Sequence, residues 1–255
     1  MLLPPMLGMG GCQKPAQNPG TPHGPSVGTG SPAPEKPAVP AEGSKPDQPK
    51  TAEAPLTVPE SLQTEAYAYY GLGATDTQNI QIVESLPDAK GKVQETKTVG
   101  THRVSVRSVS EDKAEVVEYQ TGGSEGDVTQ TVSVTPDGLF LEEVDPGKLK
   151  TPHLLILPAH VKPGDTWANH QKLDEAGQTI DVQVTYKAVR TETLKTKFGD
   201  KTALYVTDEG TGLYGKLPYH QREEWWLVKG IGLAKSVASL SVGPRKFKQG
   251  IEIVP

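Results

Sequence analysis

After residue 59 the chain alternates between apolar and polar side chains, and this period of two constrains the fold more than any other feature. Val128, Val132 and Val134 share one face with Gln130, and the residues between them are Thr and Ser. Successive residues of a strand point to opposite sides of a sheet. The alternation, which recurs over residues 180–188, therefore predicts strands with one buried face.

Turn residues divide the same region into many short strands. The stretch "PDG" at 136–138 separates two alternating segments and predicts a hairpin. The only helical candidate is one turn around Glu60–Gln63. Some ten to twelve strands predict an all-β domain, built as a sandwich, a barrel or one curled antiparallel sheet such as a half-barrel or open barrel. Further candidate strands are "HRVSVRSV", "KAEVVEYQ", "TALYVTD", "REEWWLVK", "IGLAKSVASL" and "GIEIV".

The N-terminal part has a different composition. The first aromatic residue is Tyr67, and about one residue in four between 13 and 57 is Pro. Such a segment buries too little apolar surface to offset the entropy of ordering it. We expect a disordered, Pro-rich linker over residues 13–57 and an antiparallel β domain over residues 58–255.

The single cysteine, Cys12, lies directly before this linker. The preceding residues, "LLPPMLGMGG", resemble the end of a bacterial lipoprotein signal, which closes with small residues and a Cys that takes a diacylglycerol. Met9 stands where such signals have Leu, and no basic residue precedes the apolar stretch; a start further upstream would account for both. Residues 1–12 are therefore interpreted as the remnant of a signal, and a free Cys near a frayed end is the alternative.

Charge narrows the range of partners. The 255-residue chain has a net charge of -5, all of it on residues 58–255 because the charges of the linker cancel. Without a cluster of Lys and Arg, nucleic acid is not an expected partner. The longest apolar run, residues 154–161, is too short to span a bilayer. Membrane attachment is expected through the lipid anchor, on the periplasmic or outer-membrane side of the cell envelope.

Two adjacent tryptophans mark the candidate strand at 222–229. Because neighbours in a strand diverge, one of Trp225 and Trp226 faces the core and the other faces away. Trp226 continues an apolar row with Val228, whereas Trp225 shares its face with Gln221; we therefore expect Trp226 to point inward. The other ring is either half-covered by a loop or faces a ligand in a concave apolar cavity.

Four segments occur in an order found in a known family: "LPAHVKPGDTW" (157–167), "VQVTYKAV" (182–189), "KFGDKTALYV" (197–206) and "WWLVKGIGLAKS" (225–236). Together they resemble the TapB-like group of bacterial envelope lipoproteins of unknown function, over about residues 65–255. The resemblance implies a curled antiparallel sheet, distantly like carriers of lipoproteins or lipids in the periplasm. It implies no catalytic residues.

Residue patterns for catalysis or metal binding are missing from the sequence. The six His have no metal-ligand spacing, and no GxSxG or phosphate-binding Gly loop occurs. We expect no metal, no cofactor and no enzymatic activity, with the His on the surface. The acidic doublets at 142–143, 208–209 and 223–224 are expected on exposed faces, because adjacent strand residues diverge and cannot form an acid/base pair.

Three functions of different classes remain. The first is a tethered, non-catalytic domain that binds an apolar small molecule or an extended partner in its curled sheet, through Trp167, Tyr186, Trp225 and Trp226. The alternative is a scaffold or interaction protein in envelope assembly, without a ligand cavity. An enzyme ranks last.

The membrane anchor is testable at one residue. Cys12→Ser removes the sulfur that would carry the lipid, so the variant should move from the membrane fraction to the soluble fraction of the cell. Mass spectrometry of the N-terminal peptide of the unmutated protein should show the added diacylglycerol. An unmodified Met1 in cells would contradict the interpretation.

Overall fold

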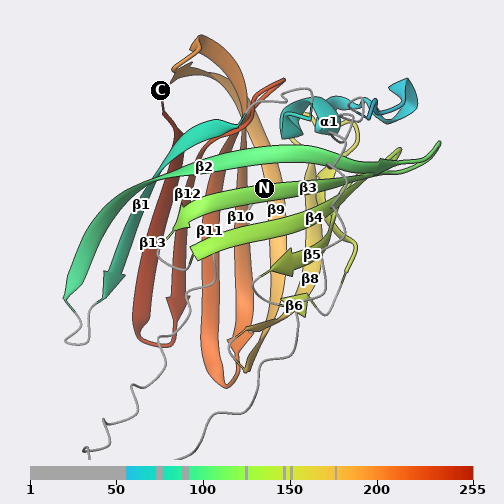
Figure 1. Cartoon of the computed structure of the whole chain (residues 1–255). Helices are drawn as coiled ribbons and strands as arrows, with labels where there is room; N and C mark the ends of the chain where they lie inside the picture. Colours follow the sequence, from blue (N-terminus) through green and yellow to red (C-terminus); the bar gives the residue numbers. More distant parts are fainter. Residues whose placement is uncertain are drawn as a thin grey trace, which may run out of the picture. The chain divides into compact units, whose positions relative to one another are not determined.

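The computed structural model is drawn in Figure 1. Cys12 and the expected linker up to residue 55 lie outside the part of the chain that the structure describes. The described part folds into one unit. It comprises residues 56–72, 77–87, 92–123, 126–145, 148–149, 152–175 and 177–254.

Strands account for most of this unit. The 13 strands slightly exceed the ten to twelve expected. In chain order the elements are η1 (Glu60–Leu62), α1 (Glu65–Tyr70), β1 (Gln78–Pro87), β2 (Val93–Val109), β3 (Ala114–Gly123), β4 (Gly126–Thr135), β5 (Gly138–Asp145), β6 (Lys148–Leu149), β7 (Leu154–Pro158), β8 (Thr166–Glu175), β9 (Gln178–Thr196), β10 (Gly199–Tyr214), β11 (Leu217–Val228), β12 (Gly232–Val242) and β13 (Arg245–Ile253).

All strands belong to one antiparallel sheet, in the order β6-β8-β9-β10-β11-β12-β13-β1-β2-β3-β4-β5-β7. Most neighbours are consecutive in the chain and are joined by hairpins, including the predicted β4–β5 turn. The exception in the middle is the pairing of β1 with β13, where Ile80 lies opposite Ile253 and Ile82 opposite Ile251. This pairing joins the first and last strands of the domain.

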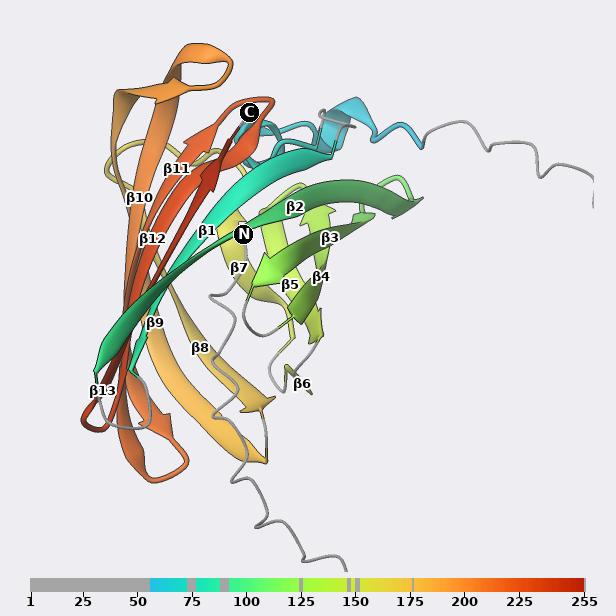
Figure 2. The same cartoon turned by 60° about the vertical axis from the view of Figure 1, so that its left-hand side comes forward.

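The two ends of the strand order come together, so the sheet curls into a nearly closed, open barrel (Figure 2). The side chain of Asn169 on β8 hydrogen-bonds to the backbone of Leu155 on β7. A sheet with one apolar face must bury that face against another layer or against itself. The predicted all-β class and curled antiparallel sheet are confirmed, and the sandwich of two sheets is wrong.

A short helix packs on this sheet near β5, β11 and β12. Thr64 caps α1, and the helix buries Ala66, Tyr69 and Tyr70. The expected turn around residue 60 is present as η1. The helix α1 was not predicted, because six residues are too few to produce an apolar stripe with helical period.

The helix ends at Gly71, whose φ is +77°. A Cβ added there would lie 2.6 Å from the carbonyl oxygen of Ile231 in the β11–β12 turn. Only glycine combines this backbone conformation with such a close approach. Gly71 therefore lets the helix dock directly against the turn.

Gly71→Ala should lower the free energy of unfolding by more than the ~1–2 kcal/mol that a left-handed backbone costs a non-glycine residue. The matched control is Gly177→Ala, at φ +78° with no atom within 4 Å of the added Cβ. Urea denaturation of both variants separates the steric clash from the backbone strain. Equal losses of unfolding free energy in the two variants would show that the close approach at Gly71 adds nothing to the cost of the substitution.

Candidate functional site

Three of the four predicted contact residues lie together inside the sheet. Trp167, Tyr186 and Trp225 are 8%, 4% and 2% exposed. The rings of Trp167 and Tyr186 are stacked, with centroids 5.4 Å apart, and the rings of Tyr186 and Trp225 are tilted with centroids 5.6 Å apart. Trp167 is part of the main hydrophobic core cluster.

The strand register brings these rings together. Trp167 on β8 lies opposite Tyr186 on β9, which lies opposite Asp208 on β10. The next strand, β11, places Glu223 opposite Asp208. Trp225 is two residues further along β11 and so points to the same side. The aromatic cluster and the two acids therefore share the inner face of four neighbouring strands.

The expectation that Trp226 points inward is wrong. Trp225 is the buried ring, and Trp226 is half-buried on the outer face. Gln221 is itself inside the sheet and 6% exposed, so sharing a face with it does not indicate the solvent side. A register shift between Trp226 and Leu227 in the pairing with β12 also breaks the apolar row on which the expectation was based.

On the outer face, Trp226 belongs to a second aromatic group. Its ring centroid is 5.0 Å from that of Tyr205, and its indole Nε1 donates to Glu192 Oε1 at 2.5 Å. Arg190 lies 4.4 Å from the Tyr205 ring centroid, and Lys235 lies 5.3 Å from the Trp226 ring. These charged side chains cover the rings, so Trp226 does not contribute to the inner cluster.

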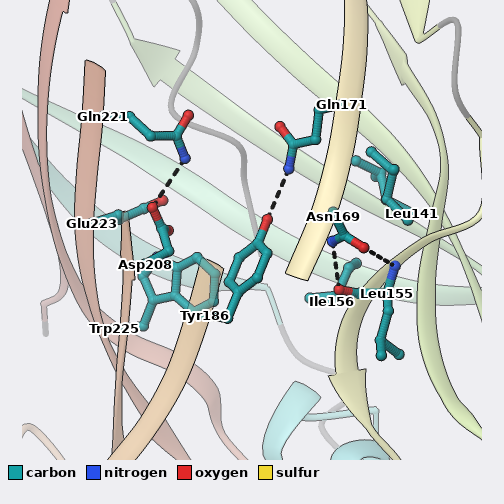
Figure 3. A pocket seen from close by; sticks show the side chains of 11 residues that line it. Leu141, Leu155, Ile156, Asn169, Gln171, Tyr186, Asp208, Gln221, Glu223 and Trp225 are labelled. Carbon is teal, nitrogen blue, oxygen red and sulfur yellow. Dashed lines mark hydrogen bonds between the residues drawn. The ribbon is translucent and has the colours of Figure 1, made fainter. Parts of the chain in front are cut away.

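The inner cluster lines a small pocket (Figure 3). The volume that the centre of a water molecule can occupy is about 20 Å³. The total empty volume of the hollow, which includes solvent at its opening, is about 340 Å³. One wall is polar and aromatic, whereas the opposite wall is aliphatic. The lining residues are Leu141, Leu154, Leu155, Ile156, Asn169, Gln171, Tyr186, Asp208, Gln221, Glu223 and Trp225.

Two carboxylates dominate the polar wall. Asp208 and Glu223 are 1% and 4% exposed. Burial raises the pKa of Asp208 to about 7. Burial, and then the charge of Asp208, raise the pKa of Glu223 well above its usual range. The expectation that these two acids lie on exposed faces is wrong. Their doublets run along single strands, whereas Asp208 and Glu223 meet across two neighbouring strands.

Gln221 holds Asp208 in place. Its Nε2 donates to Asp208 Oδ1 at 3.0 Å, and its Oε1 accepts from the hydroxyl of Tyr219 at 2.9 Å. On the other side of the pocket, Gln171 Nε2 donates to the Tyr186 hydroxyl at 2.8 Å. Two buried acceptors in this wall, Asp208 Oδ2 and Gln171 Oε1, have no hydrogen-bond partner.

The pocket lies beside the place where the two ends of the sheet meet. At this seam, Asn169 Oδ1 accepts from Leu155 N at 3.2 Å, and Asn169 Nδ2 donates to Leu155 O at 2.8 Å. Trp167 Nε1 donates to the same carbonyl at 3.2 Å. Side chains of β8 thus take the place of a backbone ladder between β7 and β8.

A second buried polar cluster ties α1 to the sheet. Glu118 Oε2 accepts from the Tyr70 hydroxyl at 2.5 Å, and Glu118 Oε1 lies 2.6 Å from His102 Nε2. His102 is 7% exposed, so the expectation of a surface position is wrong for it. Its role here is to pair with a buried acid.

The other histidines follow the expectation or lie outside the described residues. His153, His160, His170 and His220 are exposed, and His23 lies in the part that is not described. Within the described ranges, no group of three or more His, Cys, Asp or Glu is arranged to hold a metal ion. In the same ranges, no helix is long and apolar enough to cross a membrane.

Comparison with known proteins gives likenesses to solved structures. No family model matches the sequence, and no curated protein matches it. A Bacteroides fragilis protein described as exported, with a YmcC-like fold, is 15% identical with a TM-score of 0.49, covering 74% of this chain and 99% of its own. A Parabacteroides distasonis protein described as a lipoprotein is 13% identical with a TM-score of 0.45, covering 73% and 98%.

The hypothetical lipoprotein YmcC of Escherichia coli is a more distant likeness. It is 10% identical with a TM-score of 0.32, and the match covers 68% of this chain and 86% of that one. These three proteins are described as exported proteins or lipoproteins. At such identities and TM-scores the likeness does not establish membership of the TapB-like group or any activity.

The burial of the two tryptophans predicts unequal effects of truncation. Trp225→Ala should lower the free energy of unfolding by ~3–5 kcal/mol, as for other buried aromatic residues. Trp226→Ala should cost about 1–2 kcal/mol, because its ring is half-exposed. Urea denaturation measures both. A larger loss for Trp226 would contradict the assignment of Trp225 to the core.

The acid pair predicts that stability falls as pH rises. The folded-state pKa of Asp208 is about 7 against an ordinary 3.8, so the folded protein retains a proton that the unfolded chain releases. Stability is therefore greatest below the unfolded pKa, falls between the two values and levels off above the folded pKa. Asp208→Asn cannot ionise and should escape this fall.

Urea denaturation at about pH 4.5 and about pH 8 tests this directly, since the two conditions lie near the ends of that window. The stability of Asp208→Asn relative to the unmutated protein should increase at the higher pH. The control is Glu252→Gln, at an exposed acid on β13 whose charge does not act on Asp208. A difference that stays constant with pH would exclude a buried, titrating Asp208.

Proposed function

We propose that the protein is a membrane-tethered lipoprotein of the bacterial cell envelope, anchored through Cys12, whose β domain binds an extended partner without catalysis. The small residues before Cys12 and the Pro-rich segment after it support the tether. A flexible linker of this length gives a domain a reach of tens of Å from its anchor. The motifs shared with the TapB-like group support an envelope role.

The seam between β7 and β8 is the observation that carries the proposal of an extended partner. β7 pairs only with β5, and β8 pairs with β9 and, at Leu173 and Asp174, with β6. Each therefore keeps an edge that no described strand pairs with. Unpaired edges accept an added strand through backbone hydrogen bonds, and only Asn169 and Trp167 bridge this one.

The size of the pocket disfavours the apolar small molecule that the sequence analysis also allowed. Sites for such ligands measure roughly 300–1,000 Å³ and are mostly apolar. Here the enclosed space is about 20 Å³ and one wall carries two acids. A partner that lies along the seam and inserts one side chain matches this geometry better than a lipid does.

The lining residues support a binding role without catalysis. Asp208 and Glu223 could exchange protons, but the pocket lining includes no Ser, Cys, Lys or His that could act as a nucleophile. Gln171, Gln221 and Asn169 are instead hydrogen-bonded to protein groups. Such side chains fix a shape and do not activate a nucleophile.

The scaffold alternative is supported by the outer face. Val99 on β2 and Val237 on β12 are 70% and 39% exposed. These side chains point away from the barrel interior, so a partner that used them would leave the seam unoccupied. The two functions therefore predict contacts on opposite faces of the same sheet.

Photo-crosslinking in cells distinguishes the two functions. A photoreactive amino acid at Leu155, half-buried on the seam, should crosslink to a second envelope component, whereas one at Val237 should not. Loss of the Leu155 crosslink when Asn169 is replaced by a strand-blocking Pro would support strand addition at the seam. Crosslinks at Val237 alone would overturn the proposal in favour of the scaffold.

A further inference from the structure

The pocket contains two acidic side chains and no basic side chain. Asp208 and Glu223 are both nearly fully buried, and no Lys, Arg or His is among the residues that line the pocket. No Lys or Arg whose burial is described is buried anywhere in the unit. Buried carboxylates are normally paired with a cation or neutralised by a proton.

The polar wall also contains two hydrogen-bond acceptors that have no partner. Asp208 Oδ2 and Gln171 Oε1 lack partners, although Asp208 is 1% and Gln171 3% exposed. The nearby amide donors are already used, since Gln221 Nε2 donates to Asp208 Oδ1 and Gln171 Nε2 donates to Tyr186. The indole Nε1 of Trp225 is an unpartnered donor in the same wall, and it lowers the pKa of Glu223 against the larger effect of burial. A group that only donates hydrogen bonds would satisfy the free Oδ2 of Asp208.

The remaining walls suit an alkyl chain that ends in a cation. Tyr186 and Trp225 present aromatic rings to the same space (Figure 3), and such rings attract cations. Across the pocket, β5 and β7 contribute only aliphatic residues: Leu141, Leu154, Leu155 and Ile156. The pocket is therefore acidic and aromatic on one side and apolar on the other.

We propose that this pocket binds a primary ammonium group at the end of an alkyl chain, presented by a lysine side chain of the extended partner. The ammonium is about the size of a water molecule and fits the enclosed 20 Å³, while the stem occupies the outer part of the hollow. The assignment of the ammonium group to a lysine of the partner rests on the proposed function. The ammonium site itself does not depend on that function.

Binding of the ammonium should strengthen as pH rises. The titratable groups that face the site are Asp208 on β10, Glu223 on β11 and Tyr186 on β9, and β5, β7 and β8 contribute none. Burial keeps Tyr186 protonated, whereas the acids ionise with rising pH. An alkylammonium, with a pKa near 10, stays charged throughout.

The test measures binding of n-butylammonium and of N-acetyl-lysine amide to the full chain by isothermal titration calorimetry, with 1-butanol as the uncharged control. Both cations should bind saturably, several-fold more tightly at about pH 8 than at about pH 5. Asp208→Asn should weaken binding at least tenfold, and Glu252→Gln, at an exposed acid on β13, should leave it unchanged. Glu223→Gln provides a second pocket variant, and urea denaturation shows that each variant is folded.

Each other result overturns a defined part of the proposal. Equal binding of 1-butanol and butylammonium would make the pocket merely apolar, and no saturable binding would mean that it holds only water and a shared proton. Binding of Mg²⁺ or Ca²⁺ but no amine would make it a metal site. If butylammonium binds but N-acetyl-lysine amide does not, the ammonium group does not come from a lysine side chain of the partner. A crosslink at Leu155 tests the proposed function separately and survives any of these failures.

Discussion

The structure depends on the constraint that one sheet must bury its own apolar face. Alternation makes each strand apolar on one side, and α1 is too short to cover more than a small part of 13 strands. The sheet therefore curls until its ends meet, and the pairing of β1 with β13 keeps it continuous across the two ends of the domain. The short helix α1 buries Ala66, Tyr69 and Tyr70 against this sheet.

Closure encloses polar groups as well as apolar ones, and the protein satisfies them in two different ways. Glu118 receives hydrogen bonds from Tyr70 and His102, so one buried acid is matched by groups of the protein itself. Asp208 and Glu223 face a hollow, and no Lys, Arg or His is among the residues that line it. The same physical cost of burying charge thus leads to a hydrogen-bonded acid at one place and to two acids of raised pKa beside a hollow at the other.

The acid pair lies beside the seam between β7 and β8, where the proposed partner would bind. The ends of the sheet are joined by the side chains of Asn169 and Trp167 instead of a backbone ladder, and the acid pair lies in the pocket beside them. An extended chain at this edge would add backbone hydrogen bonds, while one of its side chains would reach the acids.

The sequence by itself determined the all-β class and the β4–β5 hairpin, because period-two alternation and turn residues are local signals. The tertiary structure decided which side of β11 is inside, and therefore that Trp225 and not Trp226 is buried. It also decided that Asp208 meets Glu223. Both outcomes depend on the register between strands, which bulges such as that at Trp226–Leu227 shift, and no pattern along a single strand records which residue of the next strand will lie opposite.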